Sequence, residues 1–255
     1  MVIYIVIALI PQVIAPYNPK SFVDKPLLPP SSTHPFGTDN LGRDVFSESI
    51  YGARVSLFVG VVIALITSTI GMTMGALAGY YGGIIDTLVS GATELFLVIS
   101  TFFLALMLST MFGGSVFLII MAACVILWTR TARIIRGEFL SLREKEFVMS
   151  AKAVGASNIS IIFREILPYG LRAVITNGTL TVAEGILLEA GLSFLGMGDS
   201  NAVSLGLLLN YAQLYIDTAW WMAVGPGALL SGVVLAFNLV GDAINITLNP
   251  KVRIA

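Results

Sequence analysis

Long apolar stretches separated by short polar segments dominate the sequence. Residues 1–15, 56–80, 95–129 and 173–194 are mostly apolar, and a last apolar stretch begins near Gly225. A helix needs roughly 20 residues to cross a bilayer core. The stretch 95–129 has 35 residues without a charge, and Gly113 and Gly114 divide it into two spans. The pattern therefore predicts an all-α membrane protein, a polytopic bundle with about six transmembrane helices.

The first two segments differ sharply in polarity. Residues 1–16 are predicted to be a first transmembrane helix, which is either short or lacks its beginning. A cleavable signal peptide is the weaker alternative because no basic residue precedes the apolar run. Residues 17–54 are polar and rich in proline, which is typical of an extracellular loop. Within it, an amphipathic helix is predicted to lie on the membrane surface from about Asp44, and His34 is predicted to be a surface residue.

Charge is scarce and unevenly distributed. Hydrophobic residues make up 56% of the chain and charged residues 11%, and the mean hydropathy is +0.91, which excludes a water-soluble globule. No Lys or Arg occurs in residues 55–129 or 173–250, whereas eight of the 14 fall in residues 130–172. Basic loops stay on the cytoplasmic side. We therefore predict a multi-pass protein of the cell membrane, with this interval and both termini in the cytoplasm.

Several isolated residues have simple interpretations. Arg130, Arg133 and Arg136 follow the fourth predicted span at helical spacing, and we predict that they anchor it among lipid headgroups and do not bind nucleic acid. The single cysteine, Cys124, can form no disulfide within the chain and is predicted to be a buried apolar side chain. His34 has no neighbouring ligands, so no metal site is predicted.

The fifth apolar stretch carries polar side chains that lipid cannot solvate. A carboxylate at membrane depth must face protein or water. This helix is therefore predicted to line a central pore, or alternatively its acids are bonded to neighbouring helices and hold the bundle together. The pore-lining candidates are Asn177, Thr181, Glu184 and Glu189.

Glycine recurs every four residues in the second stretch and its end. This spacing places a ridge without side chains on one helix face, where another helix can approach closely. The predicted helix-packing residues are Gly71, Gly75, Gly79 and Gly83.

The charged segment between the fourth and fifth stretches has a pattern of helix, break, helix, break. Glu146 begins the first helix, and Gly155 can take the left-handed conformation that ends it. Ser157 can cap the next helix, which Pro168 is predicted to end.

Three segments resemble the membrane subunits of ABC importers. Residues 146–168 are similar to the EAA loop, in which a Glu-Ala-Ala triplet is followed four residues later by Gly and near the end by Leu-Pro. Here the triplet reads Met149-Ser150-Ala151, followed by Gly155 and Leu167-Pro168. Residues 38–44 (TDNLGRD) and 235–251 resemble the opening and the ending of the dipeptide, oligopeptide and nickel subfamily.

The resemblance implies the type I ABC importer permease fold, with a membrane domain at residues 55–250 and a cytoplasmic coupling loop at residues 138–170. It implies as partners two cytoplasmic ATPase subunits, a second similar permease subunit and an extracellular solute-binding protein. The residues that it implies in coupling to the ATPase are Glu146, Met149, Ser150, Ala151, Ala153, Gly155, Ala156, Ser157, Leu167 and Pro168.

The expected function is that of a permease subunit which forms the pore for dipeptides or oligopeptides. No lysine follows a glycine anywhere in the sequence, so there is no P-loop. We expect a transport subunit without enzymatic activity or cofactor, whose partners hold ATP and Mg²⁺. Oligosaccharides or nickel stay open as cargo. A channel or ion-coupled transporter stays open as a different class, because acids in the fifth span could carry protons.

Overall fold

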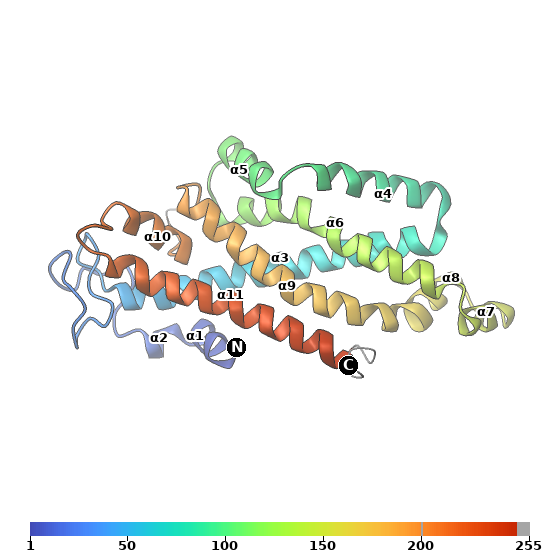
Figure 1. The fold of residues 1–255 in the computed structure, drawn as a ribbon, viewed down its shortest axis with the longest axis horizontal. Helices are drawn as coiled ribbons and strands as arrows, with labels where there is room; N and C mark the ends of the chain where they lie inside the picture. The colour runs from blue at the N-terminus through green and yellow to red at the C-terminus, as the bar shows by residue number, and fades with distance from the viewer. Residues whose placement is uncertain (200, 249–255) are drawn as a thin grey trace.

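The computed structural model describes residues 1–199 and 201–248 and shows an elongated bundle of helices (Figure 1). In this part of the chain no strand occurs, and an isolated β-bridge joins Thr38 to Asp44. The all-α fold expected from the sequence is confirmed. The elements are α1 (Val2–Leu9), α2 (Pro11–Ile14), α3 (Val45–Tyr81), α4 (Gly83–Val98), α5 (Thr101–Phe112), α6 (Val116–Leu142), α7 (Glu146–Ala153), α8 (Asn158–Ser160), the π-helix η1 (Ile161–Ile166), α9 (Leu167–Phe194), α10 (Leu205–Gln213) and α11 (Trp221–Leu248).

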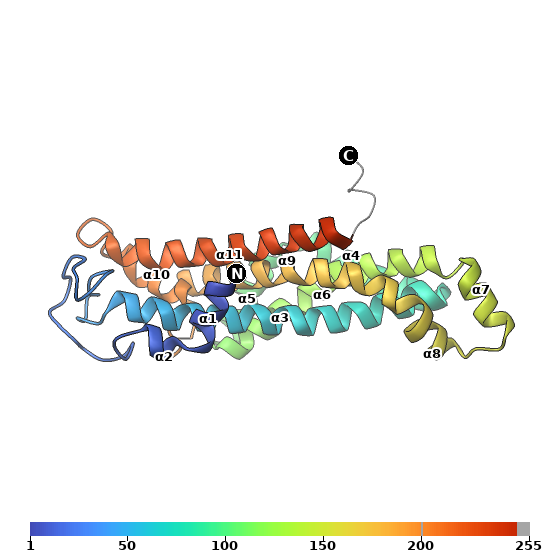
Figure 2. The ribbon, with the colours of Figure 1, turned by 90° about the horizontal axis from the view of Figure 1, so that it is seen from below.

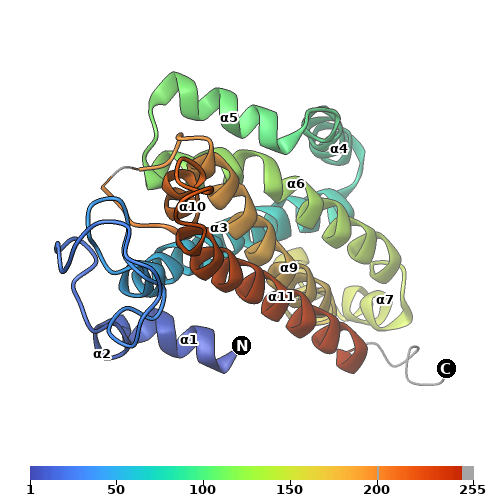
Figure 3. The same ribbon diagram turned by 60° about the vertical axis from the view of Figure 1, so that its left-hand side comes forward.

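The two ends of the bundle carry different structures. Figure 2 shows α7 projecting from one end, which we call the α7 end. The irregular segment after α2, residues 15–44, lies with α10 at the opposite end, which we call the loop end (Figures 1 and 3). The long helices α3, α6, α9 and α11 run between these ends, and α3 packs against both α6 and α9.

Among the described residues, four helices are long and apolar enough to cross a bilayer: Val45–Tyr81, Val116–Leu142, Asn158–Phe194 and Trp221–Thr247. The pair α4 and α5 passes the same test together but is bent by 84°, which gives up to five spans against the six predicted. The bend lies at Ile99 and Ser100, whose backbone is extended (ψ 132° and 121°). The third predicted span is therefore a broken helix. The predicted division at Gly113 is confirmed, because this residue ends α5 with φ 90°.

The apolar stretch at residues 1–16 forms two short helices. α1 ends at Leu9 and α2 begins at Pro11, and Ile10 between them is not helical (φ −128°, ψ 53°). Eight helical residues rise about 12 Å, which is less than half of a bilayer core of about 30 Å. The prediction of one continuous helix across this stretch is therefore wrong. Tyr4 and Ile7 pack instead in a cluster with Leu230 of α11.

The segment after Asp44 is the beginning of α3 and is not a separate helix on the membrane surface. Asp44 caps α3 by accepting a hydrogen bond from the Ser47 amide at 2.8 Å. No break follows, and the helix continues for 37 residues. Ser47 and Glu48 in its first turn are buried, with residue exposures of 0% and 1%. The sequence prediction of a surface helix fails because contacts with the rest of the chain, and not water, surround these polar side chains.

Three of the four predicted packing glycines let α3 touch the backbone of α6. A Cβ atom built on Gly71, Gly75 or Gly79 would lie 2.6, 2.4 or 2.6 Å from the nearest atom of α6. Only hydrogen fits at such separations. Gly83 has no part in this contact, since it lies beyond the end of α3 with φ 55° and no atom lies within 4 Å of its Cβ position. Gly82 and Gly83 form the turn to α4.

The predicted break at Pro168 does not occur. Residues Asn158–Phe194 form one continuous helical span, in which the π-helix Ile161–Ile166 leads directly into α9. Pro168 occupies the first turn of α9, and the Leu167 amide donates to the Ile162 carbonyl in the wider π pattern. A proline has no backbone N–H group to donate the hydrogen bond that a continuing α-helix uses. The change from π-helical to α-helical register at η1 lets the helix continue through Pro168 without that hydrogen bond.

The last two helices and the single buried cysteine complete the bundle. A short helix, α10, lies between the fifth and the last apolar stretches, and Pro226 lies within the beginning of α11. Cys124 is buried in the core with an exposure of 4%. Residue 200 of the loop and residues 249–251 of the subfamily-like ending lie outside the described residues.

Candidate functional site

The segment of residues 146–157, which we call the coupling segment, begins with α7 and lies beyond the bundle (Figure 2). α7 ends at Ala153, and Gly155 then adopts φ 82°, the left-handed conformation predicted for it. The Ala156 amide closes the end by donating to the Ala151 carbonyl at 3.0 Å. Ser157 caps the next helix through its hydroxyl, which accepts a hydrogen bond from the Ser160 amide at 3.3 Å.

Apolar contacts fix α7 to the bundle. Val148 is completely buried in a cluster with Phe139 of α6 and Ile166 of η1. Phe147 lies 5.4 Å from Tyr169, measured between ring centroids. Because η1 continues into α9, α7 is packed directly against an element that is continuous with a membrane-spanning helix.

Large apolar side chains are also exposed in the coupling segment and in α8 and η1, which follow it. The four side chains, with their exposures, are Met149 (60%), Val154 (87%), Ile159 (67%) and Phe163 (62%). We call these residues the apolar patch. Most of the predicted coupling residues are likewise exposed, namely Glu146, Met149, Ser150, Ala153, Gly155, Ala156, Ser157 and Pro168. Ala151 and Leu167 differ, because they pack on the inner cluster around Val148 and do not belong to the exposed face.

The polar side chains of α9 have unequal surroundings. Glu189 is 1% exposed and accepts hydrogen bonds from Ser56 at 2.9 Å and from Ser193 at 2.7 Å. Asn177 donates to Thr131 of α6 at 2.9 Å. Glu189 therefore bonds α9 to α3, which is the structural alternative that the sequence left open, and it faces no open space. Thr181 is also buried, with an exposure of 2%.

Two arginines of α6 form ion pairs with acids on neighbouring helices. Arg130 donates through Nη1 to Glu184 Oε1 of α9. Arg136 donates through Nε and Nη2 to the two carboxylate oxygens of Asp86 in α4, the latter at 2.8 Å. For Arg130 the prediction of an anchor at the end of a span among headgroups is wrong, whereas Arg136 lies roughly 30 Å along α6 from Val116, where a span of that length would end. Arg130 lies roughly 21 Å along α6 from Val116, too near for the end of a span, and this spacing is the signal that sequence reasoning missed.

Two open cavities lie along α6 and α9. One, of about 310 Å³, is bordered by Arg130, Glu184 and residues of α5. The other, of about 510 Å³, reaches towards the α7 end and is bordered by Glu138 of α6, Arg172 and Asn177 of α9 and Asn245 of α11. Asn177 and Glu184 are thus the two predicted pore residues that border open space.

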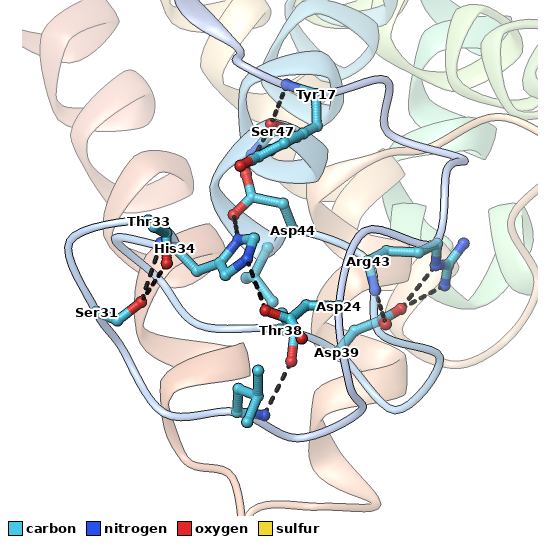
Figure 4. Close-up of polar contacts among 12 residues, drawn as sticks. Tyr17, Asp24, Ser31, Thr33, His34, Thr38, Asp39, Arg43, Asp44 and Ser47 are labelled. Atoms are coloured by element: carbon cyan, nitrogen blue, oxygen red, sulfur yellow. Dashed lines mark hydrogen bonds and ion pairs between the residues drawn. The ribbon is translucent and has the colours of Figure 1, made fainter.

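A buried polar cluster holds the segment 15–44 on the loop end of α3 (Figure 4). His34 Nδ1 lies 2.9 Å from Asp44 Oδ1, and its Nε2 lies 3.7 Å from Asp24 Oδ2. Asp39 accepts hydrogen bonds from Nε and from the backbone amide of Arg43, both at 2.7 Å. His34 belongs to a loop as predicted, but the prediction of a surface side chain is wrong because its exposure is 4%. Its partner is ten residues away in sequence, so spacing alone did not reveal it.

Relatives of known name share this sequence over most of its length. The chain is 40% identical to the dipeptide transport system permease protein DppC of Bacillus subtilis, over 94% of this chain and 78% of that protein. It is 38% identical to the oligopeptide transport system permease protein OppC of Haemophilus influenzae, over 86% and 71%. It is 32% identical to the glutathione transport system permease protein GsiD of Pectobacterium atrosepticum, over 99% and 85%.

The fold is also found in a solved structure. A chain of the MetNI methionine ABC transporter, in inward-facing conformations, matches with a TM-score of 0.64 at 19% identity, over 79% of this chain and 96% of that chain. The type I importer fold expected from the sequence is thereby confirmed. The family description "binding-protein-dependent transport system inner membrane component" matches residues 71–254. The match covers more than half of the sequence, and the chain therefore belongs to the family of binding-protein-dependent transport system inner membrane components.

Proposed function

We propose that this chain is the membrane-spanning permease subunit of an ATP-driven importer, that it forms a pore with a second, similar permease, and that it carries short peptides delivered by an extracellular solute-binding protein. Two cytoplasmic ATPase subunits hold ATP and Mg²⁺, and this chain itself carries no catalytic site. The peptide cargo is supported by the three relatives, which are named for dipeptide, oligopeptide and glutathione transport.

The observation that carries the proposal is the coupling segment with its apolar patch. Two members of the patch, Met149 and Val154, belong to the coupling segment that projects beyond the bundle, and large apolar side chains exposed there mark a surface for another protein. Exposed charged side chains lie close to the patch in the sequence, among them Lys145, Lys152 and Arg164. They support a cytoplasmic location for the α7 end, where an ATPase binds. The end of α11 lies on the same side, and the cytoplasmic position of both termini remains our prediction.

Mechanical coupling follows from the attachment of α7. The ATPase subunits bind the coupling segment, and closure of the ATPase dimer displaces α7. Val148 and the cluster around it transmit this displacement to η1 and α9. Because α9 borders both cavities, its movement changes access to the pore.

The test uses Gly155→Asp in the complete complex, reconstituted in liposomes with the binding protein loaded with peptide. Asp at this position adds a charge to the docking face, and we expect normal membrane insertion but loss of peptide uptake and of stimulated ATP hydrolysis. Gly83→Asp is the matched control: Gly83 has φ 55°, lies at the same end of the bundle and has no atom within 4 Å of its Cβ position. Normal stimulated ATP hydrolysis in Gly155→Asp would remove the coupling segment from the mechanism. Stimulation by an oligosaccharide-loaded binding protein, and by no peptide-loaded one, would overturn the peptide assignment.

A further inference from the structure

The Arg130–Glu184 pair differs from the other polar contacts between the helices. Its side chains are 56% and 36% exposed, and among the described residues they make one hydrogen bond, between Nη1 and Oε1. A guanidinium has five N–H donors and a carboxylate about four acceptor positions. Glu189 is in contrast enclosed and bonded by two hydroxyl groups. The Arg130–Glu184 pair therefore has unused hydrogen-bonding capacity on both partners.

The pair lies far from both ends of the membrane-spanning part of α6 and α9. Arg130 is roughly 21 Å along α6 from its beginning at the loop end, and Glu184 is roughly 15 Å along α9 from Phe194 at the same end. These depths fall near the middle of a bilayer core of about 30 Å. Ionisable groups at such depth are costly and mark functional sites unless they serve only to join helices.

An apolar cavity of about 310 Å³ opens beside the pair. This volume is at the lower end of the range for ligand pockets, which is about 300–1,000 Å³. A mostly apolar wall with two convergent charges of opposite sign suits a small ligand that also carries both charges. The wall residues are Thr101, Phe102, Leu127, Leu187 and Leu188.

We propose that Arg130 and Glu184 form an intramembrane binding site for the two charged ends of a short peptide. Arg130 binds the terminal carboxylate, Glu184 binds the terminal ammonium group, and the apolar wall receives the side chains. This inference rests on the proposed function and adds to it a requirement for free peptide termini inside the membrane.

Charge balance favours this ligand. A peptide that enters the middle of a membrane must keep its two terminal charges paired, because an unpaired buried charge is very unfavourable. The Arg130–Glu184 pair can open and exchange its internal contact for one contact to each terminus, so the number of paired charges is preserved. The termini of a dipeptide or tripeptide are about 7–10 Å apart when extended. A neutral oligosaccharide or a metal cation would leave at least one partner of the opened pair without a counter-charge.

The site continues towards the α7 end. On α6, Leu127, Arg130, Ile134 and Glu138 follow one another at intervals of three or four residues, so they share one helix face. On α9, the residues that border the two cavities have the same spacing. The second cavity again offers one acid and one arginine, Glu138 and Arg172. A peptide released from the first pair therefore meets a second set of opposite charges on the same face.

The experiment measures protection of a cysteine in the cavity. The purified complex carries Leu187→Cys in a Cys124→Ala background, and its labelling by a maleimide is followed without binding protein at increasing concentrations of trialanine. Leu187 is 50% exposed, so the probe has access. We expect protection by trialanine and none by N-acetyl-trialanine amide or maltotriose. Glu184→Gln and Arg130→Gln should each raise the half-protecting concentration at least about tenfold. Arg133→Gln is the matched control on another face of α6, bordering α4, and should leave it unchanged.

Peptide uptake by the same complexes in liposomes with binding protein separates the two proposals. The complex can take up trialanine while free and blocked peptides protect the cysteine at position 187 equally, or while neither protects it. Either result would overturn the binding site and leave the proposed function intact. Absence of uptake of any peptide would refute the proposed function itself. Loss of the second permease subunit from the purified Arg130→Gln and Glu184→Gln complexes would show that the pair joins subunits, and would also overturn the inference.

Discussion

Substitution of Gly75 by alanine tests whether the contact between α3 and α6 determines the stability of the bundle. The added Cβ atom would lie 2.4 Å from the Ala132 carbonyl oxygen, whereas ordinary contacts are 3.4–4 Å. The two helices must therefore separate locally by about 1 Å, and a gap of this size loses a quarter to a half of the dispersion energy of the atoms that face it. Overpacking of this kind destabilises by about 1–3 kcal/mol.

The matched control is Gly91→Ala in α4, because no atom lies within 4 Å of the Cβ position of Gly91. Alanine is favoured over glycine within a helix by up to about 1 kcal/mol, so the control is expected to be as stable as the natural protein or slightly more stable. The two variants make the same chemical change, and their difference isolates the contact with α6.

The assay heats the purified complex in detergent and measures the midpoint temperature at which its monodisperse elution in size-exclusion chromatography is lost. Each kcal/mol shifts the midpoint by about 2–4 °C in soluble domains of similar size. We therefore expect Gly75→Ala to lose monodispersity several degrees below Gly91→Ala. Equal midpoints for the two variants would refute the reasoning, because the helices would then have separated at no cost.

Two further substitutions test polar contacts. Asp44→Ala removes the cap from the Ser47 amide and the partner of buried His34, so the midpoint temperature should fall by an amount equivalent to about 1–2 kcal/mol. Asp44→Asn can still cap the helix and should lower the midpoint less. An equal loss in the two variants would argue against the capping role. Arg136→Gln leaves the Asp86 carboxylate without its arginine partner and should lower the midpoint temperature. Adding Asp86→Asn to this variant should recover part of the loss. No recovery in the double variant would mean that the pair does not link α4 to α6.

Several local features of the fold were predictable because they depend on neighbouring residues. The turn at Gly82, the left-handed Gly155 and the cap at Ser157 follow from backbone geometry that glycine and serine favour. The glycine spacing on α3 likewise indicated a close approach of helices, though not its partner. Gly83 was grouped wrongly with that ridge, because spacing cannot show that α3 ends at Tyr81.

The errors concern residues whose environment is made by distant parts of the chain. Pro168 normally ends a helix, but the preceding π-helix lets the helix continue. His34 was expected at the surface, and the folding of residues 15–44 over α3 buries it. Arg130 was assigned to headgroups because its partner, Glu184, lies 54 residues away. No local pattern identifies such distant contacts, although the short distance from Val116 to Arg130 indicated that Arg130 lies too early in α6 to end a span.

The sequence by itself determined that this protein is a helical membrane bundle, because length, hydropathy and charge act residue by residue and lipid tolerates few other structures. The family was indicated separately, by the resemblance of residues 38–44, 146–168 and 235–251 to known motifs. The tertiary structure alone decided the use of each polar group within that bundle. Glu184 and Glu189 are chemically identical and occupy one helix, yet Glu189 is enclosed by Ser56 and Ser193 whereas Glu184 faces an open cavity beside Arg130. The physical reason is that solvation and pairing of a charge depend on which helices meet around it, and packing determines these contacts.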